Sequence, residues 1–463
     1  MTTAIILAAG AGAKVWPFSE VRNKCALPVL NVPLVRRLAD GLRRVGFREV
    51  AVVVGHQAAS VKAAFVDDPG VRFLEPPRTA WPHCAGTAGA ALAGVRELPS
   101  DDGWLVVSGD LVLGDDSLRA LKQRFEHARP LAAALVHPLG TDQPQDWLCC
   151  ETRDDRLTAV EGHSRDFGQR LCGAYALSPR ALRYLECNPG LFRHVPVGGM
   201  PPLEAELAES LAMMVDAGEE VLTAPTASPL FIDVDKPWHI LEANRRLFDE
   251  QIAQLDGDQI AATARVAESA EISGRVVLGK GAVIGPRCVV EGGLMIAEGG
   301  QVTNGVIVRG GCVVGRGALV RDYAQVAGAV IGARCVVGHG AEFSGVMFDG
   351  AYLYHYCEVF GVVGESVDIG AATVCGTLRF DDQNTQHLIR GRRETPMVGA
   401  NATYFGDFSR TGVNAVTMPG VKIGARSIVG AGVVLYEDLP SGKIITVKQD
   451  LQVKDWGPAR HGW

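Results

Sequence analysis

A glycine-containing loop near the amino terminus has the composition of a phosphate-binding site. Residues 7–14 read Leu-Ala-Ala-Gly-Ala-Gly-Ala-Lys and directly follow a short apolar run. Glycines at positions 10 and 12 allow backbone N–H groups to approach a phosphate, whose charge a nearby lysine can offset. Lys14 and Lys24 are both available for that purpose. The segment therefore predicts a site for a phosphorylated ligand.

Two aspartates complete a possible phosphoryl-transfer site. Asp110 follows the apolar run Trp104–Ser108, and Asp233 ends Phe231-Ile232-Asp233. Carboxylates together with phosphates are the oxygen ligands that Mg²⁺ prefers. Taken singly, each aspartate could equally be a helix cap or a turn residue, and Lys24 an ordinary surface charge. Their combination favours a reaction that depends on positioning and electrostatics.

The residues before position 250 predict an α/β domain that would position these groups. Short β-rich runs alternate with helical patterns, which is typical of a Rossmann-like, mostly parallel sheet with helices on both faces. A helix over 237–255 closes this half, so we expect a first domain over residues 1–250. The expected elements, in order, are Ala4–Leu7, Leu34–Val45, Val50–Gly55, Ala88–Leu98 and Trp104–Ser108.

The second half repeats every six residues. An aliphatic residue recurs eleven times in one register from Val266 to Val326, slips by one residue, and resumes at Ile331 and Val337. Such a period predicts stacked coils that are stabilised only by their neighbours. Cysteines at 288, 312 and 335 share one place in the repeat, so we expect them to be small core residues rather than ligands.

The first half resembles the nucleoside-diphosphate-sugar pyrophosphorylases. The resemblance covers most of residues 1–250 and is carried by the stretch Leu7–Leu34, including Lys24-Cys25-Ala26-Leu27-Pro28. It continues at Gly86-Thr87-Ala88, Ser108-Gly109-Asp110, Val160-Glu161, Gly173-Ala174-Tyr175 and Phe231-Ile232-Asp233-Val234.

This resemblance implies transfer of a nucleotidyl group from a nucleoside triphosphate to a sugar 1-phosphate, with release of pyrophosphate. Lys24 would bridge the reacting phosphates and Lys14 would hold the leaving pyrophosphate, while Asp110 and Asp233 would bind Mg²⁺. The implied nucleotide-binding residues are Leu7, Ala8, Ala9, Gly10, Gly12, Gly86 and Thr87; the implied sugar-binding residues are Glu161, Gly173 and Tyr175.

Four positions depart from the pattern of that family. Lys14 stands where an arginine is usual, and an ammonium group does not reproduce the guanidinium fork on phosphate. Gly162 replaces a common lysine, residues 147–150 replace a stretch that often holds a glycine near the sugar, and Asp235 replaces a common glycine. These departures predict an altered turnover or an unusual sugar; Asp235 could be a spare ligand or a turn residue.

The second half resembles the hexapeptide-repeat family, whose fold is a left-handed parallel β-helix. Leu278-Gly279-Lys280-Gly281-Ala282-Val283 and the hexad that follows it carry the likeness. We therefore expect a β-helix over residues 258–440 and a tail over 441–463. The resemblance also implies packing around a threefold axis, as a trimer or a multiple of three.

Both halves together resemble the bifunctional N-acetylglucosamine-1-phosphate uridyltransferase/glucosamine-1-phosphate acetyltransferase family, above all its archaeal type. That implies acetyl-CoA as a possible co-substrate and His355 as general base on an amine. Three supporting positions differ, at Tyr352, Glu358 and Thr377, and no lysine occurs between residues 281 and 421. Three hypotheses remain open: a nucleotidyltransferase alone, a bifunctional enzyme that also acetylates, and a non-catalytic regulatory subunit.

Composition limits the other classes of function. The chain has 463 residues with 45 basic and 52 acidic side chains, and no stripe of lysine or arginine. Nucleic-acid and membrane-surface binding are therefore not expected. The 11 cysteines form no C-x-x-C pair and nothing approaches a membrane span, so we expect a cytoplasmic protein.

Overall fold

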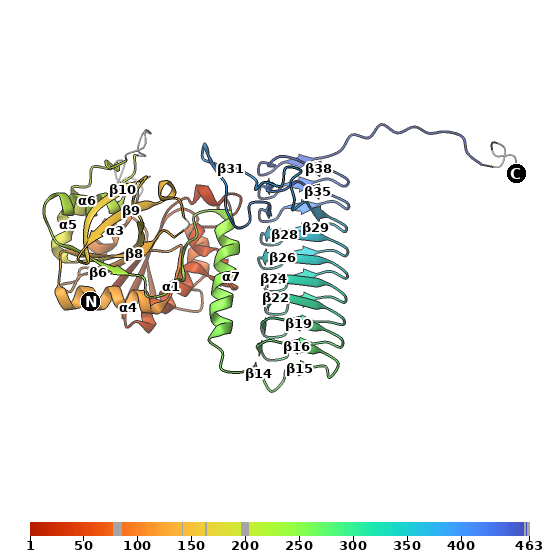
Figure 1. The fold of residues 1–463 in the computed structure, drawn as a ribbon, viewed down its shortest axis with the longest axis horizontal. Coiled ribbons are helices and arrows are strands. Elements are labelled where there is room, and N and C mark those ends of the chain that lie inside the picture. Colours follow the sequence, from red (N-terminus) through yellow and green to blue (C-terminus); the bar gives the residue numbers. More distant parts are fainter. Residues whose placement is uncertain (77–85, 141, 163, 196–202, 458–459, 461–463) are drawn as a thin grey trace.

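The computed structural model describes residues 1–76, 86–140, 142–162, 164–195, 203–457 and 460. An α/β half lies beside a long solenoid of short parallel strands, and helix α7 (Pro237–Ala253) runs between them (Figure 1). The described part of the tail after β39 (Ile444–Ile445) extends away from the solenoid, so it covers no coil of its own chain (Figure 1). Trp463 lies outside the described residues.

The first half is built on one nine-stranded sheet. Its strand order is β5-β4-β1-β6-β11-β8-β12-β10-β9. The pairs β5–β4, β4–β1, β1–β6 and β8–β12 are parallel, whereas β9, β10 and β11 pair antiparallel with their neighbours. The strands are β1 (Thr3–Ala8), β4 (Glu49–Val54), β5 (Val71–Leu74), β6 (Trp104–Ser108), β8 (Ala132–Pro138), β9 (Leu148–Arg153), β10 (Arg156–Gly162), β11 (Gln169–Leu177) and β12 (Val221–Pro225).

Helices cover both faces of this sheet, as the alternating pattern predicts. One buried cluster joins Ile5 and Val53 to helix α3, and a second joins Ile6 and Val52 to helices α1 and α4. Neighbouring residues of a strand point to opposite faces, so the two clusters are separate cores on the two sides of one sheet. The helices are α1 (Leu34–Arg44), α2 (Ala58–Ala63), α3 (Thr87–Glu97), α4 (Asp115–Ala128), α5 (Leu182–Glu186) and α6 (Leu207–Asp216).

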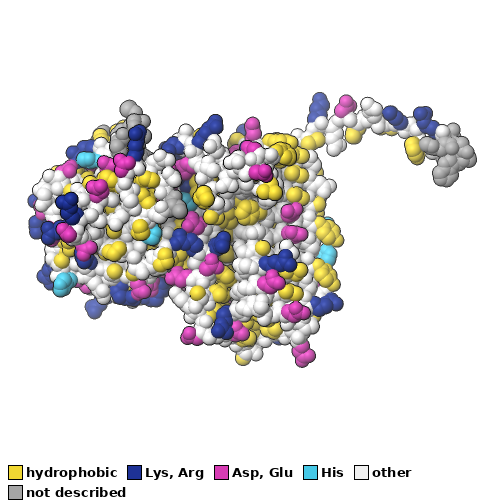
Figure 2. All heavy atoms as spheres, viewed as in Figure 1, with side chains coloured by type: hydrophobic (Ala, Val, Ile, Leu, Met, Phe, Trp, Pro, Cys, Tyr) yellow, Lys and Arg dark blue, Asp and Glu magenta, His cyan; other side chains and the backbone are white. Residues whose placement is uncertain are grey.

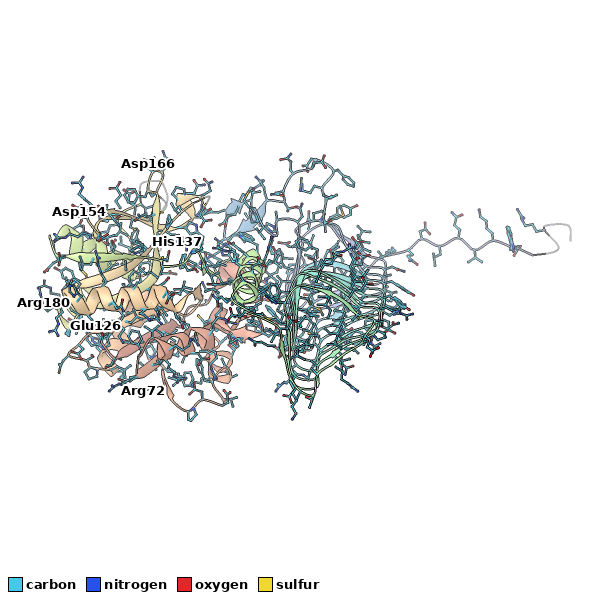
Figure 3. All side chains as sticks on the ribbon, turned by 60° about the horizontal axis from the view of Figure 1, so that its bottom comes forward. Arg72, Glu126, His137, Asp154, Asp166 and Arg180 are labelled. Carbon is cyan, nitrogen blue, oxygen red and sulfur yellow. The ribbon has the colours of Figure 1, made fainter. Side chains whose placement is uncertain are left out.

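Charged side chains of the first half lie around its outer surface. Figure 3 shows Arg72, Glu126, Asp154 and Arg180 on the perimeter, away from the solenoid. Many of these basic and acidic side chains form exposed ion pairs with each other, such as Arg124 with Asp155. Within the described ranges, none of the helices is long and apolar enough to cross a bilayer.

The second half stacks its strands in parallel with a repeat of 18 residues. Val266 pairs with Ile284, which pairs with Val302 one coil later. Three hexads therefore make one coil, and from Leu278 to Val326 the aliphatic position of each hexad points into one continuous core. Cys288, Cys312 and Cys335 are fully buried in that core, as predicted. The strands run from β14 (Gln259–Ile260) to β39, and neighbouring strands in the two main sheets pair in parallel throughout.

The slip in the hexad register has a structural cause. Coils shorten from 18 residues to 16 where β22 (Ile307–Val314), β24 (Gln325–Ile331) and β26 (Glu342–Met347) stack on one another: Val308 pairs with Val326, but Val336 pairs with Tyr352. The register shifts between Arg309 and Cys312 and again between Ala327 and Val330. One residue is thus removed from a corner in each of two successive coils while the inward-facing residues stay aligned.

Helix α7 joins the two halves through a shared core. Its Phe248 lies against the solenoid, where a Cβ atom added at Gly311 would come within 2.2 Å of the Phe248 ring. Trp238 and Leu241 of α7 belong to one buried cluster with Leu27 from the first half and Val330 from the solenoid. Arg22 adds ion pairs to Asp407 and to Glu365 across the same boundary. The halves are therefore held rigidly enough to share a site.

Candidate active site

The amino-terminal loop lies directly over Lys24. Strand β1 ends at Ala8, and the chain turns at Gly12 with φ +60 before the 3₁₀ turn Ala13–Val15 that carries Lys14. A Cβ atom at Gly12 would lie 2.9 Å from Lys24 Cβ, so only glycine allows this approach. At Gly10 an added Cβ would meet nothing within 4 Å. The backbone at Gly10 therefore faces open space that a phosphate can occupy.

Asn23 fixes the loop to the Lys24 segment and was missed from sequence. Its side chain is fully buried and donates to the carbonyl oxygens of Ala8 (3.0 Å) and His56 (2.7 Å). Its Oδ1 accepts from the backbone N–H of Cys25, which caps the short helix Lys24–Ala26. An asparagine directly before a short helix is a typical N-cap, and that signal is present in the sequence.

The two predicted aspartates lie side by side. Strands β7 (Leu111–Leu113) and β13 (Phe231–Asp233) pair antiparallel, so that Asp233 lies opposite Leu111, next to Asp110. Val234 donates its backbone N–H to the Asp110 carbonyl oxygen at 3.1 Å. Burial, followed by the charge of Asp110, raises the pKa of Asp233. Two carboxylates share one site, which is the arrangement that a divalent cation would compensate.

Lys24 is held between carboxylates of this pair and Asp235. Its Nζ forms an ion pair with Asp110 and lies 3.4 Å from Asp235 Oδ1. Burial disfavours the charged ammonium, but the surrounding carboxylates outweigh it and raise the pKa of Lys24 well above its ordinary value. Lys24 is therefore a permanent, partly buried cation at the carboxyl edge of the sheet.

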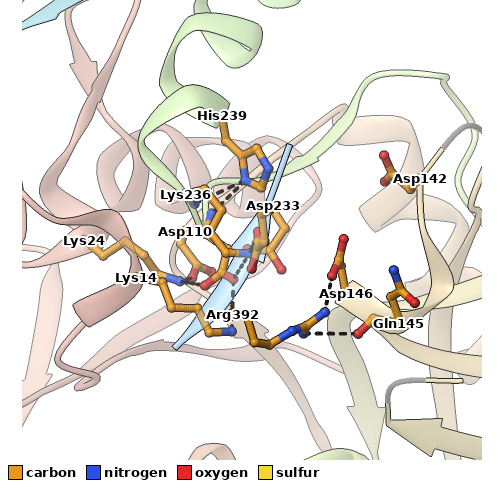
Figure 4. Close-up of polar contacts among 12 residues, drawn as sticks. Lys14, Lys24, Asp110, Asp142, Gln145, Asp146, Asp233, Lys236, His239 and Arg392 are labelled. Carbon is orange, nitrogen blue, oxygen red and sulfur yellow. Dashed lines mark hydrogen bonds and ion pairs between the residues drawn. The ribbon is translucent and has the colours of Figure 1, made fainter. Parts of the chain in front are cut away.

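Asp235 is the centre of the charge network. Besides Lys24, its carboxylate contacts Lys14 at 3.1 Å and Lys236 at 3.3 Å. Figure 4 shows Lys14, Lys24 and Lys236 gathered near Asp110 and Asp233. Burial opposes its ionisation, yet the three lysines together hold the pKa of Asp235 well below its usual range. The sequence leaves open whether Asp235 is a spare ligand or a turn residue, and both stay predictions. In the structure its carboxylate gathers Lys14, Lys24 and Lys236 around it.

A buried arginine next to Asp233 was also missed from sequence. Arg170 Nη2 lies 3.4 Å from Asp233 Oδ2, and the guanidinium lies over the Trp147 ring at 3.2 Å from its centroid. Its Nε has no hydrogen-bond partner among the described residues. Trp147, Arg170 and Asp233 line one cavity of about 660 Å³. The stretch that departs from the family pattern at residue 147 therefore borders the acidic pair.

The segment expected to meet a nucleobase is tied to helix α6. Gly86 has φ +138, and a Cβ there would come within 2.6 Å of the Ala205 carbonyl oxygen. Thr87 Oγ1 donates to Glu206 Oε2 and accepts from Leu207 N–H, both at 2.7 Å. Burial raises the pKa of Glu206. Glu206 thus joins the candidate residues, although nothing in its sequence context singled it out.

The remaining predicted residues are placed as follows. Glu161 lies on β10 opposite Cys149, Gly173 lies on β11 with φ +68, and the Tyr175 ring is buried in the core of the first half. His355 is exposed on the solenoid, where its ring meets that of Tyr356. The structure brings together Lys14, Lys24, Asp110 and Asp233, whereas His355 belongs to a separate surface. The individual roles stay predictions.

Comparisons with known proteins agree with the motifs. A family model described as a MobA-like NTP transferase domain matches residues 4–185. The chain is 26% identical to the bifunctional protein GlmU of Methanococcus maripaludis, covering 97% of this chain and 98% of that protein. It is 24% identical to a bifunctional sugar-1-phosphate nucleotidylyltransferase/acetyltransferase of Sulfurisphaera tokodaii, covering 96% of this chain and 100% of that protein.

Among solved structures, a UDP-glucose pyrophosphorylase from Acinetobacter baumanii covers 54% of this chain and 94% of its own, with a TM-score of 0.45 and 15% identity. The full-length relatives match both halves in one alignment, whereas the family model matches the first half alone. The chain thus matches the model of an NTP transferase domain over residues 4–185 and is similar, over nearly its whole length, to the bifunctional sugar-1-phosphate nucleotidylyltransferase/acetyltransferase proteins, as its motifs predicted.

Proposed function

We propose that this protein transfers a nucleotidyl group from a nucleoside triphosphate to a sugar 1-phosphate. One observation carries the proposal: Lys24, with a side chain only 16% exposed, contacts Asp110 directly beneath the open backbone of the glycine loop. Such a cation has no structural need to lie at the mouth of a phosphate loop. Its position suits a group that bridges two phosphates in the transition state.

In this reaction an oxygen of the sugar 1-phosphate attacks the α-phosphorus, and the bond to the pyrophosphate leaving group breaks. The glycine loop would bind the triphosphate through its N–H groups, and Lys14, about half exposed, would turn from Asp235 to the leaving pyrophosphate. Lys24 would offset the charge on the α-phosphate throughout. Catalysis then comes mainly from positioning and from charge, without a covalent intermediate.

Asp110 and Asp233 are the residues that would hold a Mg²⁺ ion. Asp110 Oδ1 is buried and has no hydrogen-bond partner among the described residues, which suits an oxygen reserved for a cation. Over the same residues no group of three or more ligating side chains occurs. Two carboxylates suffice for Mg²⁺, because substrate phosphates and water complete its octahedron. When bound, the ion would offset charge on the phosphates.

A panel of nucleoside triphosphates and sugar 1-phosphates, with Mg²⁺, tests this function. We expect pyrophosphate release from at least one pair, and a loss of at least about 100-fold in kcat/KM for Asp110→Asn, in line with removal of a key electrostatic group. Asp67→Asn, an exposed aspartate in an ion pair with Arg36, is the matched control. A folded wild-type protein that releases no pyrophosphate with any pair would disprove the assignment.

A second activity, acetylation of an amino-sugar 1-phosphate from acetyl-CoA, is supported by the near-complete alignment with proteins named for it. His355 is accessible and lies among exposed aromatic residues, including Tyr354 and Tyr356. It would take the proton of the amine as the acetyl group is transferred. Free CoA should appear from acetyl-CoA and glucosamine 1-phosphate, and His355→Ala should abolish it while leaving pyrophosphate release unchanged. Absence of CoA release would leave a single activity.

The arrangement of the chain is part of the proposal. We propose a transferase domain over residues 1–250, a left-handed β-helix over 258–440 and a tail over 441–463, because the type of element changes directly after α7. The solenoid exposes hydrophobic side chains on its outer surface (Figure 2). Such exposure suits contacts between copies. Trimerisation through the β-helix follows from the resemblance, and analytical ultracentrifugation tests it. A cytoplasmic location follows from the cysteines, which form no C-x-x-C pair.

A further inference from the structure

A hairpin from the solenoid reaches the transferase site. Strands β31 (His387–Ile389) and β32 (Arg392–Glu394) form an antiparallel pair within the segment that interrupts the hexads, and Figure 4 shows this part of the chain crossing the site beside Lys236 and Asp233. Its base is anchored by Ile389, which lies in the core shared by both halves. We call residues 387–394 the inserted hairpin.

Two ion pairs join the inserted hairpin to the first half. Glu394 Oε2 lies 3.1 Å from Lys236 Nζ, and only 11% of the Glu394 side chain is exposed. Arg392 Nη2 lies 2.7 Å from Asp146 Oδ1, and its Nη1 donates to the Gln145 carbonyl oxygen. Residues 392 and 394 share one face of the strand, while Arg393 points to the other, where it borders a polar cavity of the insertion.

The Glu394 contact ends on the phosphate-binding lysines. Lys236, 4% exposed, is shared between Glu394 and Asp235. Asp235 in turn holds Lys14 and Lys24. Glu394 thus offsets part of the charge of Lys236. The Asp235 carboxylate is therefore free to interact more strongly with Lys14 and Lys24.

We propose that the inserted hairpin is a working part of the transferase site, in which Glu394 is a positioning residue that sets the affinity for pyrophosphate. Without this carboxylate, Lys236 draws on Asp235 alone, and Lys14 and Lys24 are released toward an incoming anion. The site also gains one unit of positive charge. Both effects strengthen the binding of pyrophosphate and slow its release as product. The inference rests on the proposed nucleotidyl transfer.

Isothermal titration calorimetry of the full chain with pyrophosphate and EDTA tests the proposal without turnover. We expect Glu394→Gln to lower the Kd for pyrophosphate about 3- to 10-fold, and to lower kcat when the reaction is run. Arg392→Ala, which releases the hairpin, should change the Kd in the same direction. Arg393→Ala, on the opposite face of the strand, is the matched control and should leave the Kd unchanged.

Unfolding around the lysines cannot imitate this result, because a site whose lysines are no longer held together binds an anion more weakly. A second variant tests the route: in Lys236→Met the Glu394→Gln change should lose its effect, since coupled positions are not additive. The inference is overturned if the wild-type protein binds pyrophosphate and the Kd is unchanged or higher in both Glu394→Gln and Arg392→Ala. Failure of the wild-type protein to bind pyrophosphate contradicts the proposed function instead.

Discussion

Replacement of Asp235 by asparagine should have opposite effects on stability and on anion binding. The side chain keeps its shape but loses the charge that faces three lysines. Removing one partner of a buried ion pair costs roughly 3–5 kcal/mol, because an uncompensated charge stays behind. Here Lys24 keeps Asp110, Lys236 keeps Glu394, and Lys14 has access to water. We therefore expect a loss of about 2 kcal/mol, below that range.

The same change should strengthen the binding of pyrophosphate. In the wild-type protein an anion must displace Asp235 from Lys14 and Lys24, and the variant removes that competition. A tenfold decrease in Kd, equal to about 1.4 kcal/mol, is the expected size. Thermal unfolding measures the loss of stability, and calorimetry in EDTA measures the Kd.

Asp67→Asn is the matched control for both measurements, since its carboxylate pairs with Arg36 at the surface and it should change neither result. If Asp235→Asn weakened the binding of pyrophosphate, the Asp235 carboxylate would be needed to hold the lysines in place when the anion is bound. If stability and Kd were both unchanged, the contacts with the lysines would be without consequence. Either outcome refutes the reasoning.

Four further substitutions test the packing of helix α7, the anchoring of the glycine loop and the protonation of His387. Phe248→Ala should cost about 3–5 kcal/mol through the cavity it leaves, and Gly311→Ala should also destabilise by clashing with Phe248; in thermal unfolding the double variant should lose less than the sum. Asn23→Ala should raise the KM for the triphosphate, because the loop loses its anchors at Ala8 and His56, with KM for the sugar phosphate as the internal control. Burial, followed by the charge of Lys422, lowers the pKa of His387 from 6.5 to about 4, so its neutral form stabilises the fold fully above pH 6.5. That contribution, about 3 kcal/mol, should be lost as the pH falls from 6.5 to 4, and His387→Gln should flatten the pH dependence of the unfolding temperature; equal slopes would contradict the assignment.

The regular elements could be predicted from sequence because their signals are local. The expected helix over residues 34–45 is α1, and the expected strand over 104–108 is β6. The hexad period identified the stacked coils, since every sixth residue must enter the same core. The shortening of the coils from 18 to 16 residues appeared in the sequence only as a slipped register. The sequence did not predict that the missing residues are removed at a corner of the coil.

The charged residues around the site were only partly predictable. Lys14, Lys24, Asp110 and Asp233 stood in recognisable motifs and lie together. Arg170 did not, because a single arginine at the start of a strand carries no signal for the Trp147 ring and the carboxylate that it meets. Partners that are far apart along the chain leave no local pattern.

The sequence by itself determined the two types of architecture, the glycine-containing loop and the acidic pair, because periodicity and short motifs are properties of neighbouring residues. Only the tertiary structure decided that Asp235 gathers the lysines and that Glu394, 158 positions after Lys236 in the sequence, completes the network. Helix α7 brings the solenoid against the first half, and long-range ion pairs form only after that packing has fixed where each charge lies.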